Sequence, residues 1–280
     1  MSSLLDPTAE LLRLNAVALV GRPLGGSQSA AVVADDGRSY VVKHPANPQG
    51  RRVLANELLA SLIGQALGVP VAVPAIVRLS PEFVESNDMT SRHRGGLVPW
   101  TAGECFGSQM PMDGYAAYGY ISDVGMTGVA NLSDMAGVLA FDKWLCNCDG
   151  RQVIYYGGPG GAALRVMAID HGYCFDACDW DFPDSPMRGV YARPHVYDGV
   201  TDIESFEPWL SRIEQFDPAL LQRIGRAVPP EWYGEPNELA TLLDAVLSRR
   251  SLVRSLVHNT VTARREWFPA WETVRVAVCA

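Results

Sequence analysis

The first hundred residues alternate short apolar runs with turn-forming residues, which is the pattern of β-strands joined by tight turns. Asp35-Asp36-Gly37-Arg38 separates two such runs and predicts a hairpin, and a glycine-rich turn at 21–29 precedes them. Residues 1–14 predict a short amphipathic helix or a tail. We expect a small antiparallel five-stranded sheet, with strands at 16–20, 30–34, 39–43, 71–79 and 96–100.

Helical spacing of apolar residues replaces this pattern in two regions. Residues 51–67 predict a helix that ends at Gly68, with Glu57 off its main apolar stripe. An irregular stretch rich in glycine and aromatic residues follows at 100–122. From Leu132 the chain becomes mainly helical, with Ser133 as the expected N-cap. Further helices are expected at 203–216, 218–227 and 236–257.

Composition narrows the class of protein without naming a function. The chain has 280 residues, 48% of them hydrophobic, and a net charge of −8. It has no run rich in lysine and arginine, so binding to nucleic acid through phosphate neutralisation is not expected. It also has no leader pattern and no apolar run of membrane-spanning length, so we expect no membrane association and a cytoplasmic location.

Cysteines allow two interpretations. In a reducing cytosol the six cysteines are expected to be free thiols that act as small apolar side chains. Alternatively, the pairs Cys146/Cys148 and Cys174/Cys178 can supply four ligands to a zinc ion in an interaction domain. Neither spacing is the usual C-x₂-C knuckle.

Two acidic residues in the stretch 141–175 carry the candidate chemistry. Asp149 follows an expected helix end, and Asp170 closes an apolar run before His171-Gly172. In phosphoryl transfer one carboxylate accepts the proton of the attacking hydroxyl, and another holds Mg²⁺ against the nucleotide phosphates. Asp-Gly and Asp-x-Gly sequences also form ordinary turns, so neither motif decides the matter alone.

Phosphate contacts are the second candidate feature. The chain has 23 basic residues, of which only Lys43 and Lys143 are lysines. Lys43 ends the third expected strand, close in sequence to a glycine loop that matches neither the Walker A nor the dinucleotide motif. The loop amides can cover phosphates while Lys43 reaches them from the next strand, although a plain hairpin fits equally well. The loop residues are Gly25, Gly26, Ser27, Gln28 and Ser29.

An acidic segment follows the second motif. Four aspartates, Asp176, Asp179, Asp181 and Asp184, lie close together before and within residues 180–194. Their spacing does not fit a calcium loop. Either they form a solvated loop or they receive a basic substrate.

The order of these motifs resembles the HipA-like kinase family, over residues 15 to about 195. The resemblance implies an α+β, bilobal, protein-kinase-like fold, with a small antiparallel β-sheet N-lobe carrying one helix (residues 1–100) and a larger, mainly helical C-lobe (residues 101–280). The matching segments are GGSQS (25–29), DDGRSYVVK (35–43), NPQG with RRVLANELLA (47–60), LGVPV (67–71), FGS (106–108), FDKWLCNCDGRQ (141–152), AIDHGYCF (168–175) and FPDSPMRGVYAR (182–193).

The same resemblance implies roles for single residues. Lys43 would contact the phosphates of ATP, Glu57 would orient it, and the glycine loop would cover those phosphates. Asp149 would be the catalytic base and Asp170 the main Mg²⁺ ligand. Arg151 would offset charge on the transferred phosphoryl group. From the residues alone, a solvated Glu57 is the more common arrangement, and periodicity does not decide between the two.

One position departs from the family pattern. Ile154 stands where a metal-binding asparagine is expected, five residues after Asp149, and Gln152 or Asn147 would have to substitute. The expected function is an ATP- and Mg²⁺-dependent kinase that phosphorylates a protein Ser/Thr or a small molecule. A nucleotide-binding pseudokinase or adaptor without turnover is the main alternative, and the zinc-stabilised interaction domain is the other. The phosphoacceptor is not identified.

Overall fold

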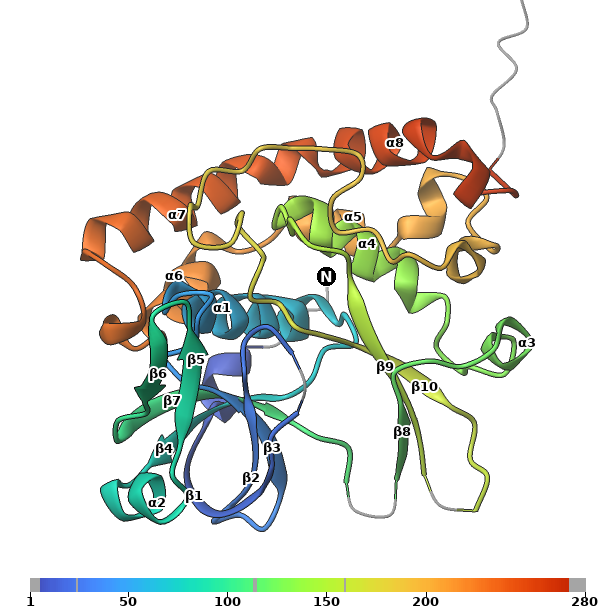
Figure 1. Ribbon diagram of the computed structural model, residues 1–280. Coiled ribbons are helices and arrows are strands. Elements are labelled where there is room, and N and C mark those ends of the chain that lie inside the picture. Colours follow the sequence, from blue (N-terminus) through green and yellow to red (C-terminus); the bar gives the residue numbers. More distant parts are fainter. Residues whose placement is uncertain (1–5, 24, 113–114, 159, 272–280) are drawn as a thin grey trace, which may run out of the picture.

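A closed five-stranded barrel forms one part of the molecule, and helices with a three-stranded sheet form the other (Figure 1). The computed structural model describes residues 6–23, 25–112, 115–158 and 160–271. The barrel strands follow the order β1-β2-β3-β7-β4. Their bounds are Leu12–Gly21 (β1), Ala30–Ala34 (β2), Ser39–Lys43 (β3), Gly103–Gln109 (β7) and Pro74–Leu79 (β4).

The barrel closes through a parallel pairing that the sequence pattern did not predict. β1 pairs antiparallel with β2 but parallel with β4, where Leu12 lies opposite Ala75. The expectation of a purely antiparallel sheet is therefore wrong at this seam. Small and branched side chains from β2, β3 and β4, including Val32, Val42 and Val77, fill a separate apolar core. This core fixes the strand that ends in Lys43.

Predictions for the first three strands are largely confirmed. β2 and β3 have the expected bounds, whereas β1 begins at Leu12 rather than at residue 16. Instead of the helix or tail expected at 1–14, residues Pro7–Glu10 form one 3₁₀ turn and β1 follows directly. Residues 1–5 of that expected segment lie outside the described residues.

The fifth barrel strand lies in a segment that was expected to be irregular. β7 pairs with both β3 and β4 and has a buried centre at Cys105, Phe106 and Gly107. The strand expected at 96–100 is instead exposed from Gly96 to Pro99, and only Trp100 is buried. As β6 (Gly96–Pro99) it pairs with β5 (Thr90–His93) in a separate hairpin. Pairing on two sides, which local sequence does not reveal, decides which strand belongs to the barrel.

Helix α1 (Arg52–Leu67) runs between the barrel and the other helices (Figure 1). It ends, as predicted, at Gly68, whose φ of 72° is left-handed and suits glycine. Almost all of its residues are buried, so it has no solvated face, and Glu57 is buried with only 2% exposure. A second short helix, α2 (Pro81–Ser86), adds to the single helix expected in this half of the chain.

The remaining elements form the second part of the molecule. The three-stranded sheet has the order β10-β9-β8. Its strands are Ala116–Tyr118 (β8), Gln152–Gly157 (β9) and Arg165–Ile169 (β10). The helices are Asp123–Met126 (α3), Asp134–Trp144 (α4), Trp209–Glu214 (α5), Pro218–Arg226 (α6), Pro236–Ser248 (α7) and Val253–Ala263 (α8). Further 3₁₀ turns span Pro194–Tyr197, Ile203–Phe206, Pro230–Trp232, Arg249–Leu252 and Arg265–Trp267.

Two of the long helices predicted from apolar spacing are interrupted. The helix expected at 203–216 is divided at Pro208, after which α5 begins. The helix expected at 236–257 is divided by the turn that starts at Arg249. There the Arg249 side chain turns inward and donates to the carbonyl oxygens of Trp144 and Lys143 at 2.9 and 3.0 Å. Ser133 does precede α4, but its side chain makes no capping hydrogen bond.

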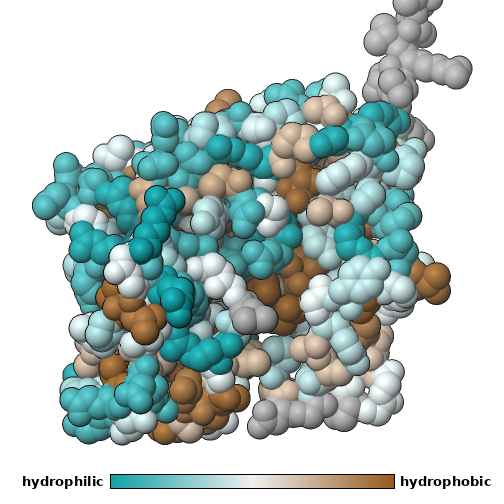
Figure 2. Space-filling view, in the orientation of Figure 1, coloured by the Kyte–Doolittle hydropathy of each residue, from teal (hydrophilic) through white to brown (hydrophobic). Residues whose placement is uncertain are grey.

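Apolar residues are unevenly distributed on the face seen in Figure 2. They gather over the barrel and beside the three-stranded sheet, whereas the upper part, over α7 and α8, is mostly polar. None of the helices in the described part of the chain is long and apolar enough to span a bilayer.

A glycine in α4 tests the packing between α4 and α5. A methyl group on Gly137 would collide with the indole ring of Trp209. Gly137→Ala gains helix propensity but overpacks this contact, so we expect the free energy of unfolding to fall by roughly 1–2 kcal/mol in denaturant titrations. Gly199, where a methyl group meets nothing within 4 Å, provides the control. Equal free energies of unfolding for Gly137→Ala and Gly199→Ala would contradict the close contact between Gly137 and Trp209.

Candidate functional site

Three distant segments meet at the ammonium group of Lys43. Lys43 comes from the end of β3, Glu57 from α1 and Asp170 from the residue that follows β10. The Lys43 Nζ donates to Glu57 Oε1, and also to Asp170 Oδ1 at 2.7 Å. Lys43 and Glu57 are buried, while the Asp170 side chain keeps 30% exposure. The structure therefore brings together the three residues named from the sequence, and the solvated alternative for Glu57 is wrong.

Charge pairing dominates the electrostatics of this cluster. Burial by itself lowers the pKa of Lys43, but Glu57 and Asp170 raise it above its ordinary value. Burial raises the pKa of Asp170, and Lys43 more than compensates, so that this pKa lies below its ordinary value. Lys43 is thus a fixed cation and Asp170 a fixed, partly open anion at neutral pH.

The turn after Asp170 is held by α1. The backbone N–H of His171 donates to Glu57 Oε2 at 2.9 Å, and the Asn56 amide donates to the carbonyl of Gly172 at 2.8 Å. A Cβ at Gly172 would lie 2.5 Å from Val53 Cγ1, so only glycine fits this close approach. The Glu57 carboxylate therefore holds both Lys43 and the backbone beside Asp170.

His171 is a buried residue that the sequence predictions did not use. Its ring lies edge-on to Phe141 at a centroid distance of 5.7 Å, and both ring nitrogens lack a hydrogen-bond partner among the described residues. Burial and the nearby Arg151 lower the pKa of His171 well below its ordinary value. The imidazole is therefore neutral and acts as an apolar packing group.

Asp149 is exposed, and its position is fixed through its backbone. Its N–H donates to Asn147 Oδ1 at 3.2 Å, and its carbonyl accepts from the Gly189 N–H at 3.0 Å. Its own Oδ1 accepts from the Gly150 N–H at 2.8 Å. The carboxylate consequently sits on a fixed loop at the surface, open to an incoming hydroxyl.

The side chain of Arg151, two residues after Asp149, points into the protein interior. The Arg151 side chain is fully buried and forms a double contact with Asp142, with Nε to Oδ2 at 2.8 Å. Its Nη1 donates to the carbonyl of Ile169 at 2.7 Å and to that of Asp170 at 3.3 Å. This guanidinium is not open to a substrate phosphoryl group. It ties the loop that carries Asp149 to the strand end that carries Asp170.

The two candidate substitutes for the missing asparagine occupy different environments. Asn147 is 1% exposed, and its amide nitrogen donates to Asp142 Oδ1 at 3.1 Å while its oxygen accepts from Asp149. Asn147 is therefore not open to a cation. Gln152 is exposed at the start of β9, directly opposite Ile169, next to Asp170. Ile154 is half-buried on the same strand and faces Met167.

The glycine loop is tied to the β5–β6 hairpin. The Gln28 side chain exchanges two 2.7 Å hydrogen bonds with the backbone of Arg92, and Arg22 donates to the carbonyl of Thr90 at 2.7 Å. Gln28 has a φ of 49° and closes a turn onto Gly25. Its side chain therefore anchors the loop and is not free for a phosphate. Ser27 and Ser29 are largely buried.

The glycine loop lies next to the Gln49 side chain at position 26. A Cβ at Gly26 would lie 3.0 Å from Gln49 Nε2, on the segment that leads into α1. The loop thus lies close to the N-terminal end of the helix that carries Glu57.

Cysteine geometry does not provide a zinc site. Cys105, Cys146, Cys148, Cys174 and Cys178 are free thiols. Across the described ranges, no group of three or more histidine, cysteine, aspartate or glutamate residues is arranged to hold a metal ion. The zinc alternative is therefore left without a ligand set in that part of the chain, and a cation at Asp170 would need further ligands from an amide side chain, a bound molecule or water.

Some residues that support the site were missed in the sequence. Asp142 is the clearest case. It lies on the apolar stripe of the helix predicted from residue 132, and a carboxylate at a buried position needs a charged or hydrogen-bonding partner. The contacts of Asn56 with Gly172, and of Gln28 with Arg92, carry no such signal. They join residues 116 and 64 positions apart in the chain.

The fold of the chain is similar to that of several solved kinases. It matches the crystal structure of the Golgi casein kinase with a TM-score of 0.55 and 12% identity, over 92% of this chain and 76% of that one. It matches the Helicobacter pylori proinflammatory kinase CtkA with a TM-score of 0.50 and 12% identity, over 91% and 99%. A Golgi casein kinase structure with Mn/ADP bound gives 0.50 and 11%, over 91% and 74%. No curated protein sequence matches the chain.

The fold is therefore kinase-like. The family model of the HipA-like kinase matches residues 23–259, which is most of the chain, and the protein belongs to that family. The resemblance drawn from the sequence motifs is confirmed, and the matched region continues well beyond residue 195.

The buried ion pair yields a prediction about stability. Lys43→Met leaves the Glu57 carboxylate buried without its cation, so we expect the free energy of unfolding near pH 8 to fall by about 3–5 kcal/mol. Burial raises the pKa of Glu57, and without Lys43 nothing equivalent opposes this. In Lys43→Met the folded protein therefore tolerates a protonated Glu57 at acid pH, and it loses stability as the pH rises and this carboxyl group has to ionise. The deficit measured by urea titration is therefore smaller near pH 5.

The matched control removes the charge that Lys43→Met leaves behind. The double variant Lys43→Met/Glu57→Gln is expected to recover part of the loss near pH 8, because a neutral amide is easier to bury than an unpaired carboxylate. Equal free energies of unfolding for the single and double variants at both pH values would contradict a destabilisation caused by the unpaired Glu57 carboxylate.

Proposed function

We propose that the protein is an ATP- and Mg²⁺-dependent phosphotransferase that phosphorylates a hydroxyl group on a protein Ser/Thr or a small molecule. The observation that carries this proposal is the contact of Lys43 with both Glu57 and Asp170, beside a loop that presents the exposed Asp149. A cation, an open carboxylate for a metal and a second open carboxylate are the groups that phosphoryl transfer needs.

The residues have distinct roles in this proposal. Lys43 binds the nucleotide phosphates, and Glu57 holds its side chain in place. Backbone amides of Gly25–Ser29 cover the phosphates. Asp149 accepts the proton of the attacking hydroxyl. Arg151 acts as a positioning residue, since its buried guanidinium links the Asp149 loop to the carbonyls of Ile169 and Asp170.

The donor set at Asp170 fits Mg²⁺. The Asp170 carboxylate is ionised and partly exposed, and only its Oδ1 accepts a hydrogen bond within the described residues. The exposed Gln152 amide lies on the neighbouring strand. Mg²⁺ prefers a few such oxygen ligands together with phosphate oxygens and water. When bound there, the ion would neutralise charge on the nucleotide phosphates.

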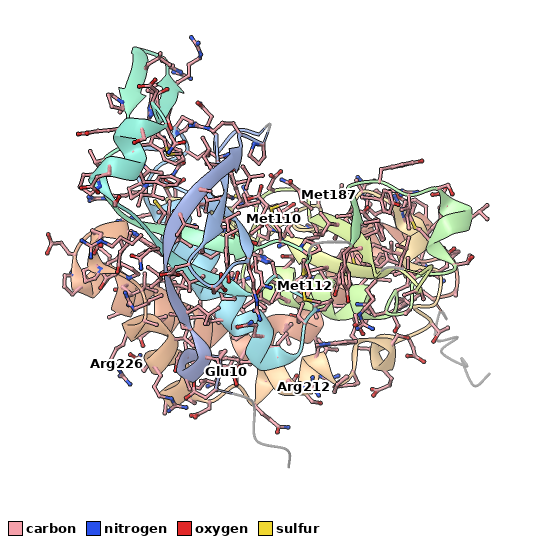
Figure 3. All side chains as sticks on the ribbon, turned by 90° about the horizontal axis from the view of Figure 1, so that it is seen from below. Glu10, Met110, Met112, Met187, Arg212 and Arg226 are labelled. Carbon is pink, nitrogen blue, oxygen red and sulfur yellow. The ribbon has the colours of Figure 1, made fainter. Side chains whose placement is uncertain are left out.

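We also propose that the chain works as two lobes with the nucleotide between them. The segment that joins β7 to β8 carries Met110 and Met112, which lie between the barrel and the three-stranded sheet in Figure 3. The expected boundary at residue 100 would separate β7 from the barrel, so we propose a boundary after Gln109.

A binding-only pseudokinase is the second candidate, and Ile154 is the observation that favours it. The side chain of Ile154 cannot ligate a cation, and it lies half-buried in β9 opposite Met167. If Gln152 does not complete the metal site, nucleotide binding without efficient turnover is expected.

Nucleotide binding is tested by thermal unfolding. At about 100 times its Kd, Mg-ATP would add about 2.7 kcal/mol to the stability and raise Tm by roughly 5–10 °C. Asp170→Asn is expected to remove the Mg²⁺-dependent part of this shift, whereas Asp149→Asn keeps it. Asp149→Asn should instead lower the rate of ADP formation at least about 100-fold.

The outcomes separate the candidates. No shift in the wild-type protein excludes both the kinase and the pseudokinase. A shift without ADP formation selects the pseudokinase. ADP formation at a rate that Asp149→Asn does not change contradicts the role of Asp149 as the base.

Metal ligation by Gln152 is tested separately. If Gln152 ligates Mg²⁺, Gln152→Ala should raise the Mg²⁺ concentration for half of the ATP-dependent Tm shift by at least about tenfold. Gln215→Ala, an exposed glutamine at the end of α5, is the matched control and should leave this concentration unchanged. An unchanged Mg²⁺ requirement in Gln152→Ala would remove Gln152 from the site.

A further inference from the structure

Lys143, the other lysine of the chain, holds a loop beside the candidate catalytic residue. It lies in the last turn of α4 and is only 5% exposed. Its ammonium donates to the carbonyl oxygens of Ser185 at 3.1 Å, of Pro186 at 3.0 Å and of Arg188. An ammonium group has three N–H donors, so these three backbone carbonyls use all of them.

This arrangement explains why the position is a lysine in a chain that otherwise uses arginine. Three acceptors converge on one point, which suits a compact ammonium, whereas a guanidinium spreads five donors in a plane. Burial lowers the pKa of Lys143 to about 8, so at neutral pH the group is still mostly charged. The carbonyl dipoles compensate the buried charge, and the charge in turn draws the loop onto α4.

The loop held by Lys143 lies directly on the loop that carries Asp149. The Gly189 N–H donates to the Asp149 carbonyl at 3.0 Å, and the Arg151 N–H donates to the Val190 carbonyl at 3.3 Å. Gly189 has a φ of 66°, and a Cβ there would lie 2.8 Å from Asp142 Cβ. A shift of the carbonyl at position 188 therefore moves the N–H that holds the Asp149 backbone.

Ion pairs support the same loop from its other side. Both oxygens of Asp184 accept from Arg249, at 2.6 and 2.9 Å, and Asp176 accepts from Arg188 at 2.6 Å. The carboxylates of Asp184 and Asp176 thus hold the loop without any added anion.

We propose that Lys143 is a positioning residue that fixes residues 184–190 against the Asp149 loop, so that the acceptor side of the site is ordered in the unmodified chain. Asp142 and Lys143, which are adjacent at the end of α4, hold different segments. Asp142 holds Asn147 and Arg151, which flank Asp149, and Lys143 holds the loop across from them. Only the description of this side as the acceptor side rests on the proposed function.

Amide hydrogen exchange followed by NMR tests the proposal on the free protein. Lys143→Met keeps the length of the side chain and removes all three donors. We expect the Gly189 amide to exchange at least tenfold faster in this variant, and the amides of α1 to be unaffected. Arg212→Met is the matched control, since Arg212 also donates to a backbone carbonyl, that of Leu67, at 2.7 Å. Arg212 and Met187 lie well apart in Figure 3.

Further variants separate positioning from general destabilisation. Lys143→Arg keeps the charge but not the three-donor geometry, so its Gly189 amide should also exchange faster. If Lys143→Met does not fold, Lys143→Gln, which retains at most two donors, is judged by the same measurement. Unchanged Gly189 exchange in a folded Met or Gln variant, or full protection in the Arg variant, overturns the proposal.

Activity gives an independent readout. With Mg-ATP as the probe, Lys143→Met should keep the ATP-dependent Tm shift and the KM for ATP, while kcat for ADP formation falls about tenfold. An equal loss of ATP binding would contradict a role confined to the acceptor side. If the wild-type protein neither binds nor hydrolyses ATP, the proposed function fails, and the exchange experiment still decides whether Lys143 orders the loop.

Discussion

The structure depends on one buried cation that needs two carboxylates from distant parts of the chain. Removing Lys43 from water is unfavourable unless Glu57 and Asp170 accompany it. This requirement sets the position of β3, the rotation of α1 and the end of β10 relative to one another. It also explains why α1 is buried on nearly all sides. Glu57 contacts Lys43 of the barrel and the backbone that follows β10, so the helix must lie between the two.

Around this cluster, buried polar side chains fix the backbone rather than contact a ligand. Asn56 holds the turn after Asp170, and Arg151 ties that turn to the Asp149 loop. Asp142 and Lys143 hold both sides of Asp149 from a single helix end. The open groups, Asp149 and part of Asp170, are therefore presented by a rigid frame. Such preorganisation is what a reaction limited by positioning and charge stabilisation requires.

The proposed site has one strong and one weak element. Lys43, Glu57 and Asp170 meet as the proposed function requires, and the chain belongs to the HipA-like kinase family. Ile154, however, leaves Gln152 as the remaining candidate for a second protein ligand. A longer, exposed amide is a less rigid ligand than a buried asparagine. Metal affinity is thus the property on which the kinase and the pseudokinase differ most clearly.

Local pattern was sufficient to predict β2, β3 and the end of α1 at Gly68, because turn residues and apolar spacing act within a few positions. The motif order also led to the family and to the three residues that meet at Lys43. Tertiary structure alone decided the parallel closure of the barrel and the choice of β7 as its fifth strand. It also decided that Arg151 and Asn147 face inward and that Gln28 binds the β5–β6 hairpin. Such outcomes depend on partners many residues away, and the side chain that a polar residue meets is set by packing rather than by its neighbours in sequence.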